Sequence, residues 1–341
     1  MAVFFQIVGV LFCLFVLLVV GGILFVRYKL RQALQSLASA APVGTPPRIH
    51  LDRLITPEWK DASATTALVD PLRGIGFQDA GLYCVREMPD LRLQALSQPT
   101  ESVYAVVYEH PTAGVWLDLV CRYQDGTSLT YLNTRQGAGL EQRPGHGKMR
   151  APGLEAVPLY QRMLAERPQR PLLPAPPEEF LTIFEQAYAE EMDWRNSRGG
   201  PTEAEVRAVL AESGTEATPE QIAATQEMLA YQALEGLEEA LRERFLHTST
   251  LSAAEWETIR ERVVFVHDRL PADSVEDLFE EWLGMEVEEL ADVGVPPVGS
   301  VRERFAQRNA AFANGKGFRK IGEVTEPVPT DVYVAPEEDP V

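Results

Sequence analysis

The sequence predicts an N-terminal transmembrane helix, then an α+β domain built on an antiparallel β-meander with flanking helices, and then an all-α acidic helical domain. Three observations lead to this fold class: an unbroken apolar segment at the start, a series of short strand-like segments, and helix-start signals in an acidic second half. The predicted parts are a transmembrane helix at 2–26, a juxtamembrane helix and Pro-rich linker at 27–59, the α+β domain at 60–168, the acidic helical domain at 177–313 and a flexible C-terminal tail at 314–341.

The apolar segment runs from Ala2 to Val26 and is interrupted only by Gln6. At about 1.5 Å per residue, a helix of this length crosses a hydrocarbon core about 30 Å thick. A cleaved signal peptide has a shorter apolar segment with a cleavage site directly after it, whereas this chain has basic residues within 27–31. Positive charge beside a span stays in the cytoplasm. We therefore expect a single-pass protein of a cell inner membrane, with its N-terminus outside and its C-terminal body in the cytoplasm.

Charge and cysteine content exclude several kinds of site. Residues 171–300 hold 29 acidic and 8 basic side chains, in a chain whose formal net charge is −19. So acidic a body argues against nucleic-acid binding, which needs Lys and Arg to neutralise phosphates. The three cysteines form no CxxC pair and have no histidine at metal spacing, so we expect no metal and no other cofactor. Arginine outnumbers lysine, which favours a bacterial source.

The α+β domain is predicted from five short apolar or alternating segments separated by turn signals. A helical patch before Gly74 precedes them, and a helix from about Leu154 to Glu166 would cover the sheet. Strands that follow one another directly pair as antiparallel neighbours. The five segments are Leu82–Met88, Leu91–Leu96, Val103–Tyr108, Val115–Tyr123 and Ser128–Thr134.

The last two predicted strands form a hairpin whose outer face is a candidate partner-binding surface. Asp125-Gly126 predicts a two-residue type I′ turn, which would pair Asp118 with Asn133 and Trp116 with Arg135 on that face. Trp116 would then be the anchor for a protein partner. A solvated face with Arg135 stacked on Trp116 is the plain alternative. A hydrolytic site that adds Glu109 and His110 is the third alternative.

A second candidate site is a glycine-punctuated segment that we expect to be a loop. Its residues Arg143, His146, Lys148 and Arg150 would bind a phosphate or an anionic lipid head group. A solvated loop, or a loop that docks on the acidic half, is the alternative. Gln142 and Met149 stand where a nucleotide-binding loop needs glycine and Ser or Thr, and no other catalytic motif occurs.

The acidic half shows helix-start signals at Pro177, Thr202, Thr218, Ser252 and Ser274. A stripe from Trp256 through Val263 and Val266 to Leu270 has 3-4 spacing and predicts one amphipathic helix. Glu190, Glu191 and Asp193 near the end of the first helix are either a solvated helix end or a cation or partner site. In the tail we expect at most one short strand, at Val332–Val334.

These features favour a non-enzymatic, membrane-anchored interaction or scaffold protein. Its expected partners are the lipid bilayer, through the N-terminal helix, and an unknown protein. A membrane-bound hydrolase, or a sensor of an anionic lipid or small ligand, are the alternatives.

Overall fold

The computed structural model describes residues 46–111, 113–134, 140–212, 218–271, 273–284, 299–311 and 317–337. They form two compact units, each considered by itself below. The predicted transmembrane helix at 2–26 and the linker as far as residue 45 lie outside the described residues. Within the described ranges, no helix combines the length and the apolarity that a membrane span requires.

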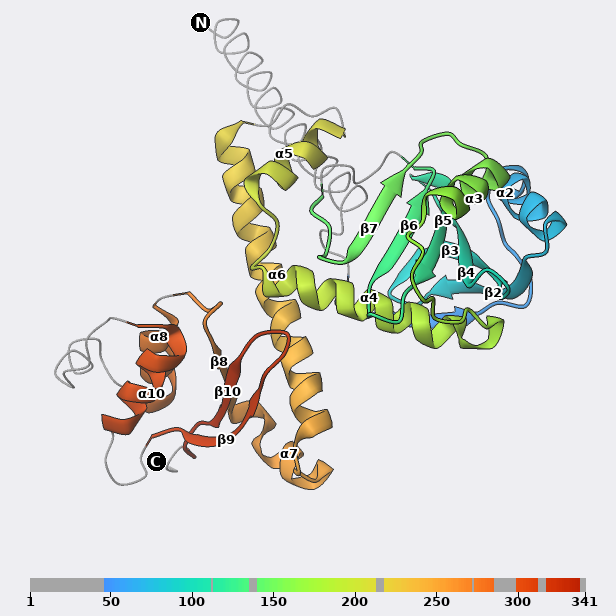
Figure 1. The fold of residues 1–341 in the computed structure, drawn as a ribbon. Coiled ribbons are helices and arrows are strands. Elements are labelled where there is room, and N and C mark those ends of the chain that lie inside the picture. Colours follow the sequence, from blue (N-terminus) through green and yellow to red (C-terminus); the bar gives the residue numbers. More distant parts are fainter. Residues whose placement is uncertain are drawn as a thin grey trace, which may run out of the picture. The chain divides into compact units, whose positions relative to one another are not determined.

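A seven-stranded sheet forms the framework of the first unit, which comprises residues 52–180 and 203–223 (Figure 1). The strands lie side by side in sequence order, and from β2 to β6 all neighbours are antiparallel. The predicted α+β class and its five-stranded meander are confirmed. The strands are β1 (Leu51–Arg53), β2 (Gln78–Val85), β3 (Met88–Gln98), β4 (Val103–His110), β5 (Gly114–Arg122), β6 (Ser128–Leu132) and β7 (His146–Arg150).

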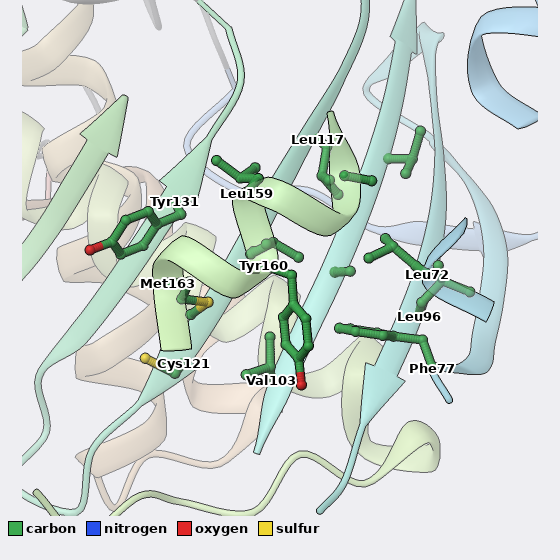
Figure 2. Packing of buried hydrophobic residues seen from close by; sticks show 14 of the residues in the cluster. Leu72, Phe77, Leu96, Val103, Leu117, Cys121, Tyr131, Leu159, Tyr160 and Met163 are labelled. Carbon is green, nitrogen blue, oxygen red and sulfur yellow. The ribbon is translucent and has the colours of Figure 1, made fainter. Parts of the chain in front are cut away.

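Two helices, α2 (Ala62–Gly74) and α3 (Ala156–Glu166), cover one face of this sheet. Asp61 caps α2 by accepting a hydrogen bond from the Ala64 N–H at 2.9 Å. Side chains alternate along the strands, so one set of them points into the core. Figure 2 shows this core packed against α2 and α3. Burying one large apolar side chain contributes about 1.5–3 kcal/mol. Among the core residues are Leu72, Leu96, Leu117, Leu119, Leu159 and Met163, all with no exposed surface.

The β5–β6 hairpin has a three-residue turn, so the predicted two-residue turn is wrong. Tyr123 N–H donates to the Thr127 carbonyl at 2.9 Å, and Gly126 has φ +82°. Asp125 stabilises the turn because its Oδ1 accepts from the Thr127 N–H at 3.0 Å. The extra residue shifts the register by one position, and Asp118 consequently lies opposite Leu132 instead of Asn133.

Residues 146–150, predicted as part of a loop, form the edge strand β7, parallel to β6. Gln142 binds the backbone of Lys148 as a neighbouring strand would. Its Oε1 accepts from the Lys148 N–H at 2.9 Å, and its Nε2 donates to the Lys148 carbonyl at 3.3 Å. This pairing satisfies edge groups that would otherwise be open to a further strand.

The second unit comprises residues 46–51, 181–202 and 224 onward, and it contains a three-stranded antiparallel sheet in the order β8-β10-β9 (Figure 1). The predicted all-α class is therefore wrong for this part of the chain. The strands are β8 (Val263–His267), β9 (Arg319–Val324) and β10 (Thr330–Val334), and β9 and β10 come from the predicted tail. The helices of the acidic half are α4 (Phe180–Ser197), α5 (Glu203–Glu212, in the first unit), α6 (Pro219–Thr248), α7 (Ala253–Ile259), α8 (Ser274–Leu283) and α10 (Val301–Ala311).

The small sheet has an apolar layer on each side. Leu237, Leu241 and Phe245 of α6 pack with Phe265 and Val332 on one side. On the other side, side chains of α8 and α10 pack with β8, with Tyr333 of β10, and with Phe318 and Ala335 next to β9 and β10. Every residue of β10 is buried. The Ser252–Glu255 capping box that starts α7 is confirmed, with both reciprocal hydrogen bonds present.

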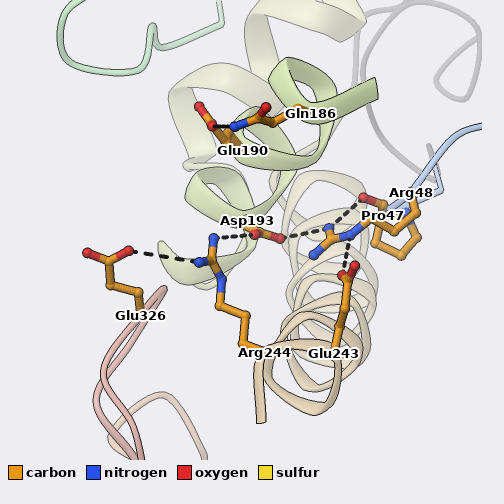
Figure 3. A network of polar contacts seen from close by, with 8 residues as sticks. All are labelled: Pro47, Arg48, Gln186, Glu190, Asp193, Glu243, Arg244 and Glu326. Carbon is orange, nitrogen blue, oxygen red and sulfur yellow. Dashed lines mark hydrogen bonds and ion pairs between the residues drawn. The ribbon is translucent and has the colours of Figure 1, made fainter. Parts of the chain in front are cut away.

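An ion-pair network ties the segment 46–51 to α4 and α6 (Figure 3). Arg48 lies 2.8 Å from Asp193 Oδ1 and 2.7 Å from Glu243 Oε2, and Arg244 approaches the other oxygen of Asp193 at 3.4 Å. Asp193 is 4% exposed. Burial lowers the pKa of Arg48, but its bonds to Asp193 and Glu243 outweigh burial and raise that pKa. Asp193 is one of the acidic residues predicted near this helix end as a cation or partner site. It binds arginines of its own chain.

Candidate functional site

The face of the seven-stranded sheet opposite α2 and α3 carries aromatic and charged side chains, and we term it the polar face. Residues that pair across neighbouring strands point to the same face. The polar face is therefore built of rows that run across the strands. The rows are Tyr108–Trp116, Val106–Asp118–Leu132–Arg150, Val120–Thr130–Lys148 and Arg122–Ser128–His146.

Tyr108 and Trp116 form the aromatic end of the polar face. Their rings are stacked, with centroids 4.9 Å apart and planes 12° apart. Both side chains are half-buried. Burial, and after it the charge of Asp118, raises the pKa of the Tyr108 hydroxyl. Such a pair contributes about 0.5–1.5 kcal/mol beyond its burial and gives a rigid apolar contact surface.

Asp118 lies in the row next to this pair, and one of its carboxylate oxygens lacks a hydrogen-bond donor from the described part of the chain. Within the described residues, its Oδ1 is shielded from solvent and has no hydrogen-bond partner. Burial raises the pKa of Asp118 to about 7, against the lowering effect of the charges on Lys148 and Arg150. Asp118 therefore changes charge near neutral pH, where an unperturbed aspartate is fully ionised.

Arg122, Ser128 and His146 form the basic end of the polar face, together with Lys148. Ser128 Oγ and His146 Nδ1 lie 2.8 Å apart. The Arg122 Nε is shielded from solvent and has no hydrogen-bond partner in the described part of the chain. Arg122 was not among the predicted site residues, although alternation along β5 puts it on the same face as Trp116 and Asp118.

The structure brings together residues from both predicted sites. Trp116 and Asp118 share the polar face with His146, Lys148 and Arg150, which the sequence placed in a separate loop. Arg143 precedes β7, and its carbonyl accepts from the His146 N–H at 2.9 Å. Arg135 lies outside the described residues.

Asn133 does not share the polar face with Trp116 and Asp118. Its Oδ1 accepts from the Leu117 N–H at 2.8 Å, and its Nδ2 donates to the Leu154 carbonyl at 3.3 Å. It therefore ends the β5–β6 pairing and fixes the chain before α3. The prediction that pairs it with Asp118 is wrong because of the shifted register.

Of the predicted hydrolytic group, Glu109 does not share a face with Asp118. Glu109 points to the helix-covered face, away from Asp118, because the two positions differ in alternation. It is 4% exposed, and its two oxygens accept from the N–H groups of Lys60 and Asp61 at 2.9 and 2.5 Å. Glu109 thus holds the start of α2 in place. Among the described residues, no three His, Cys, Asp or Glu side chains cluster as metal ligands would.

Comparison of the chain with protein-family models, with curated proteins and with solved structures finds no significant match.

Proposed function

We propose that the chain is a single-pass inner-membrane protein whose cytoplasmic body binds a partner protein through the polar face. Support for the anchor comes from the apolar segment at 2–26 and the basic residues within 27–31. Support for a partner comes from the sheet register, which puts a stacked aromatic pair beside a carboxylate in need of a donor.

The position of Asp118 beside Trp116 is the observation that carries this proposal. A buried polar atom without a partner costs about 1–3 kcal/mol. A donor from a partner, ideally a Lys or Arg side chain, would remove this cost and hold Asp118 ionised. An apolar side chain of the same partner would lie on Trp116, since aromatic residues dominate the energy of protein interfaces.

The partner's chemistry follows from charge as well. The chain carries a formal net charge of −19, so a basic partner approaches it faster than an acidic one. We therefore expect a protein segment with a Lys or Arg next to an apolar residue.

Partner binding is tested with tagged full-length chains purified from native membranes in a mild detergent. We expect wild type to retain a stoichiometric protein that Trp116→Ala and Asp118→Asn lose. Tyr231→Ala is the matched control, because Tyr231 is an aromatic residue on α6 with 64% exposure. Equal recovery with Trp116→Ala and wild type contradicts the proposal.

The membrane topology is tested separately. A reporter that fluoresces only in the cytoplasm, fused after Val341, should be active, and one that works only outside should be silent. The opposite pattern would place the body outside the cytoplasm and end this part of the proposal without touching the partner site.

A further inference from the structure

The basic end of the polar face contains an arginine whose charge is not balanced by any described residue. Arg122 is half-buried. Its Nε has no hydrogen-bond partner, and no described carboxylate forms an ion pair with its guanidinium. A partly desolvated charge is less stable without a counterion than with one, and arginines that are fully buried are almost always paired.

Glu178 and Glu179, which act on Tyr104 together with Arg122, do not balance the charge of this arginine. The charge of Arg122 lowers the pKa of Tyr104, and the charges of Glu178 and Glu179 raise it. Burial is the largest effect and brings the pKa of Tyr104 to about 12. Both glutamates are exposed, and neither pairs with Arg122. The counterion of Arg122 is therefore a group that does not belong to the described residues.

The surroundings of Arg122 are suited to an oxyanion with several oxygens. Opposite it on β6 is Ser128, whose hydroxyl lies 2.8 Å from His146 Nδ1. One row away, Thr130 and Lys148 add a hydroxyl and an ammonium group on the same face. Neighbouring strands are about 4.8 Å apart, so donors from three strands lie within about 10 Å of one another on this face. A planar carboxylate would use two of them, whereas a phosphate can use donors from every side.

We propose that Arg122, Thr130 and the Ser128–His146 pair, with Lys148 beside them, bind the phosphate group of a phosphate monoester. Arg122 donates two hydrogen bonds, and the two hydroxyl groups and Lys148 contact the remaining oxygens. The phosphate is either a soluble one or the head group of phosphatidic acid in the membrane. This inference does not depend on the proposed protein partner.

The test uses the full-length protein in neutral detergent micelles. Its thermal unfolding is followed with increasing inorganic phosphate or glycerol phosphate, with chloride keeping the ionic strength constant. A second series replaces part of the detergent by phosphatidic acid, with phosphatidylcholine as the reference. A rise in melting temperature in the first series indicates a soluble phosphate, and a rise only in the second indicates the lipid head group.

Two variants make the test specific. Arg122→Gln should weaken the apparent affinity by about tenfold or more, because charge-assisted hydrogen bonds are lost. Thr130→Val keeps every charge and should weaken it as well. Arg53→Gln is the matched control, since Arg53 is exposed on β1, four strands away from β5.

The stability of Arg122→Gln without phosphate separates binding from a structural role. We expect it to equal or exceed that of wild type, because the variant removes an unbalanced charge. A lower melting temperature without phosphate would mean that the guanidinium has a partner within the chain, and would overturn the inference. So would a wild type that responds to neither series, or an Arg122→Gln variant that responds like wild type.

Discussion

Replacing Asp118 by Asn should stabilise the protein at alkaline pH and leave it unchanged in acid. Burial raises the pKa of Asp118 from 3.8 to about 7 in the folded state. Between these values the folded state keeps a proton that the unfolded state has released. Stability therefore falls as pH rises from about 4 to 7, and above 7 the full cost of the buried charge is present. Asparagine has the same shape and does not titrate.

The size of this effect follows from the pKa shift. A shift of about three units corresponds to about 4 kcal/mol at 1.36 kcal/mol per unit. Asp118 is only partly buried, so solvent screening makes this an upper bound and about 2–4 kcal/mol is expected. The gain of Asp118→Asn over wild type should approach this value at pH 8 and vanish near pH 4.

The assay is urea unfolding of both full-length proteins in detergent at a series of pH values. The difference between variant and wild type cancels the titration of all other groups. Asp125→Asn is a control of opposite sign, because hydrogen bonds from Thr127 lower the pKa of Asp125. That variant should be less stable than wild type at neutral pH and equal to it in strong acid. A gain of Asp118→Asn that does not depend on pH would refute the reasoning.

Two further predictions concern the second unit. His267 has no exposed surface, and burial lowers its pKa to about 4, so the unfolded state binds a proton first as pH falls below about 6.5. His267→Leu should gain up to about 3 kcal/mol over wild type between pH 6.5 and 4, measured by urea unfolding; a constant difference would contradict this. A Cβ on Gly236 of α6 would lie 2.5 Å from the side-chain nitrogen of Asn196 on α4. Gly236→Ala should therefore cost about 1–3 kcal/mol, whereas Gly74→Ala, with no atom within 4 Å, should not lower the melting temperature.

The first unit was largely predictable because its strands show clear alternation and are separated by turn signals. The polar face was predicted only in part, and one residue in a turn accounts for the error. An Asp-Gly pair fits both a two-residue turn and a three-residue turn with glycine in the left-handed region. The longer turn occurs here, and it moved every pair of the β5–β6 hairpin by one position.

Two of the missed strands, β7 and β8, have different causes. β7 contains Gly147 and follows Pro144-Gly145, which indicate a loop, and its pairing with β6 is a long-range contact that local sequence does not encode. Val263 and Val266 fit the helical 3-4 spacing of their neighbours, yet the stretch Val263–His267 is rich in β-branched residues and forms β8. Its partner β10 lies more than sixty positions later in the chain. The spacing of apolar residues around Val263 and Val266 therefore could not reveal this pairing.

Because Arg48 is bound to Asp193, the distance between α4 and the predicted transmembrane helix is limited. Twenty residue steps separate the end of the predicted span at Val26 from Pro46, whose carbonyl accepts a hydrogen bond from the Tyr188 hydroxyl at 2.7 Å. A fully extended chain of that length covers about 70 Å, and a helix continuing to Leu37 would reduce this to about 50 Å. If 2–26 lie in the bilayer as we propose, the part of α4 around Tyr188 stays within about 70 Å of the membrane surface. A protein that binds this part of α4 would then be at the membrane surface or within that distance of it.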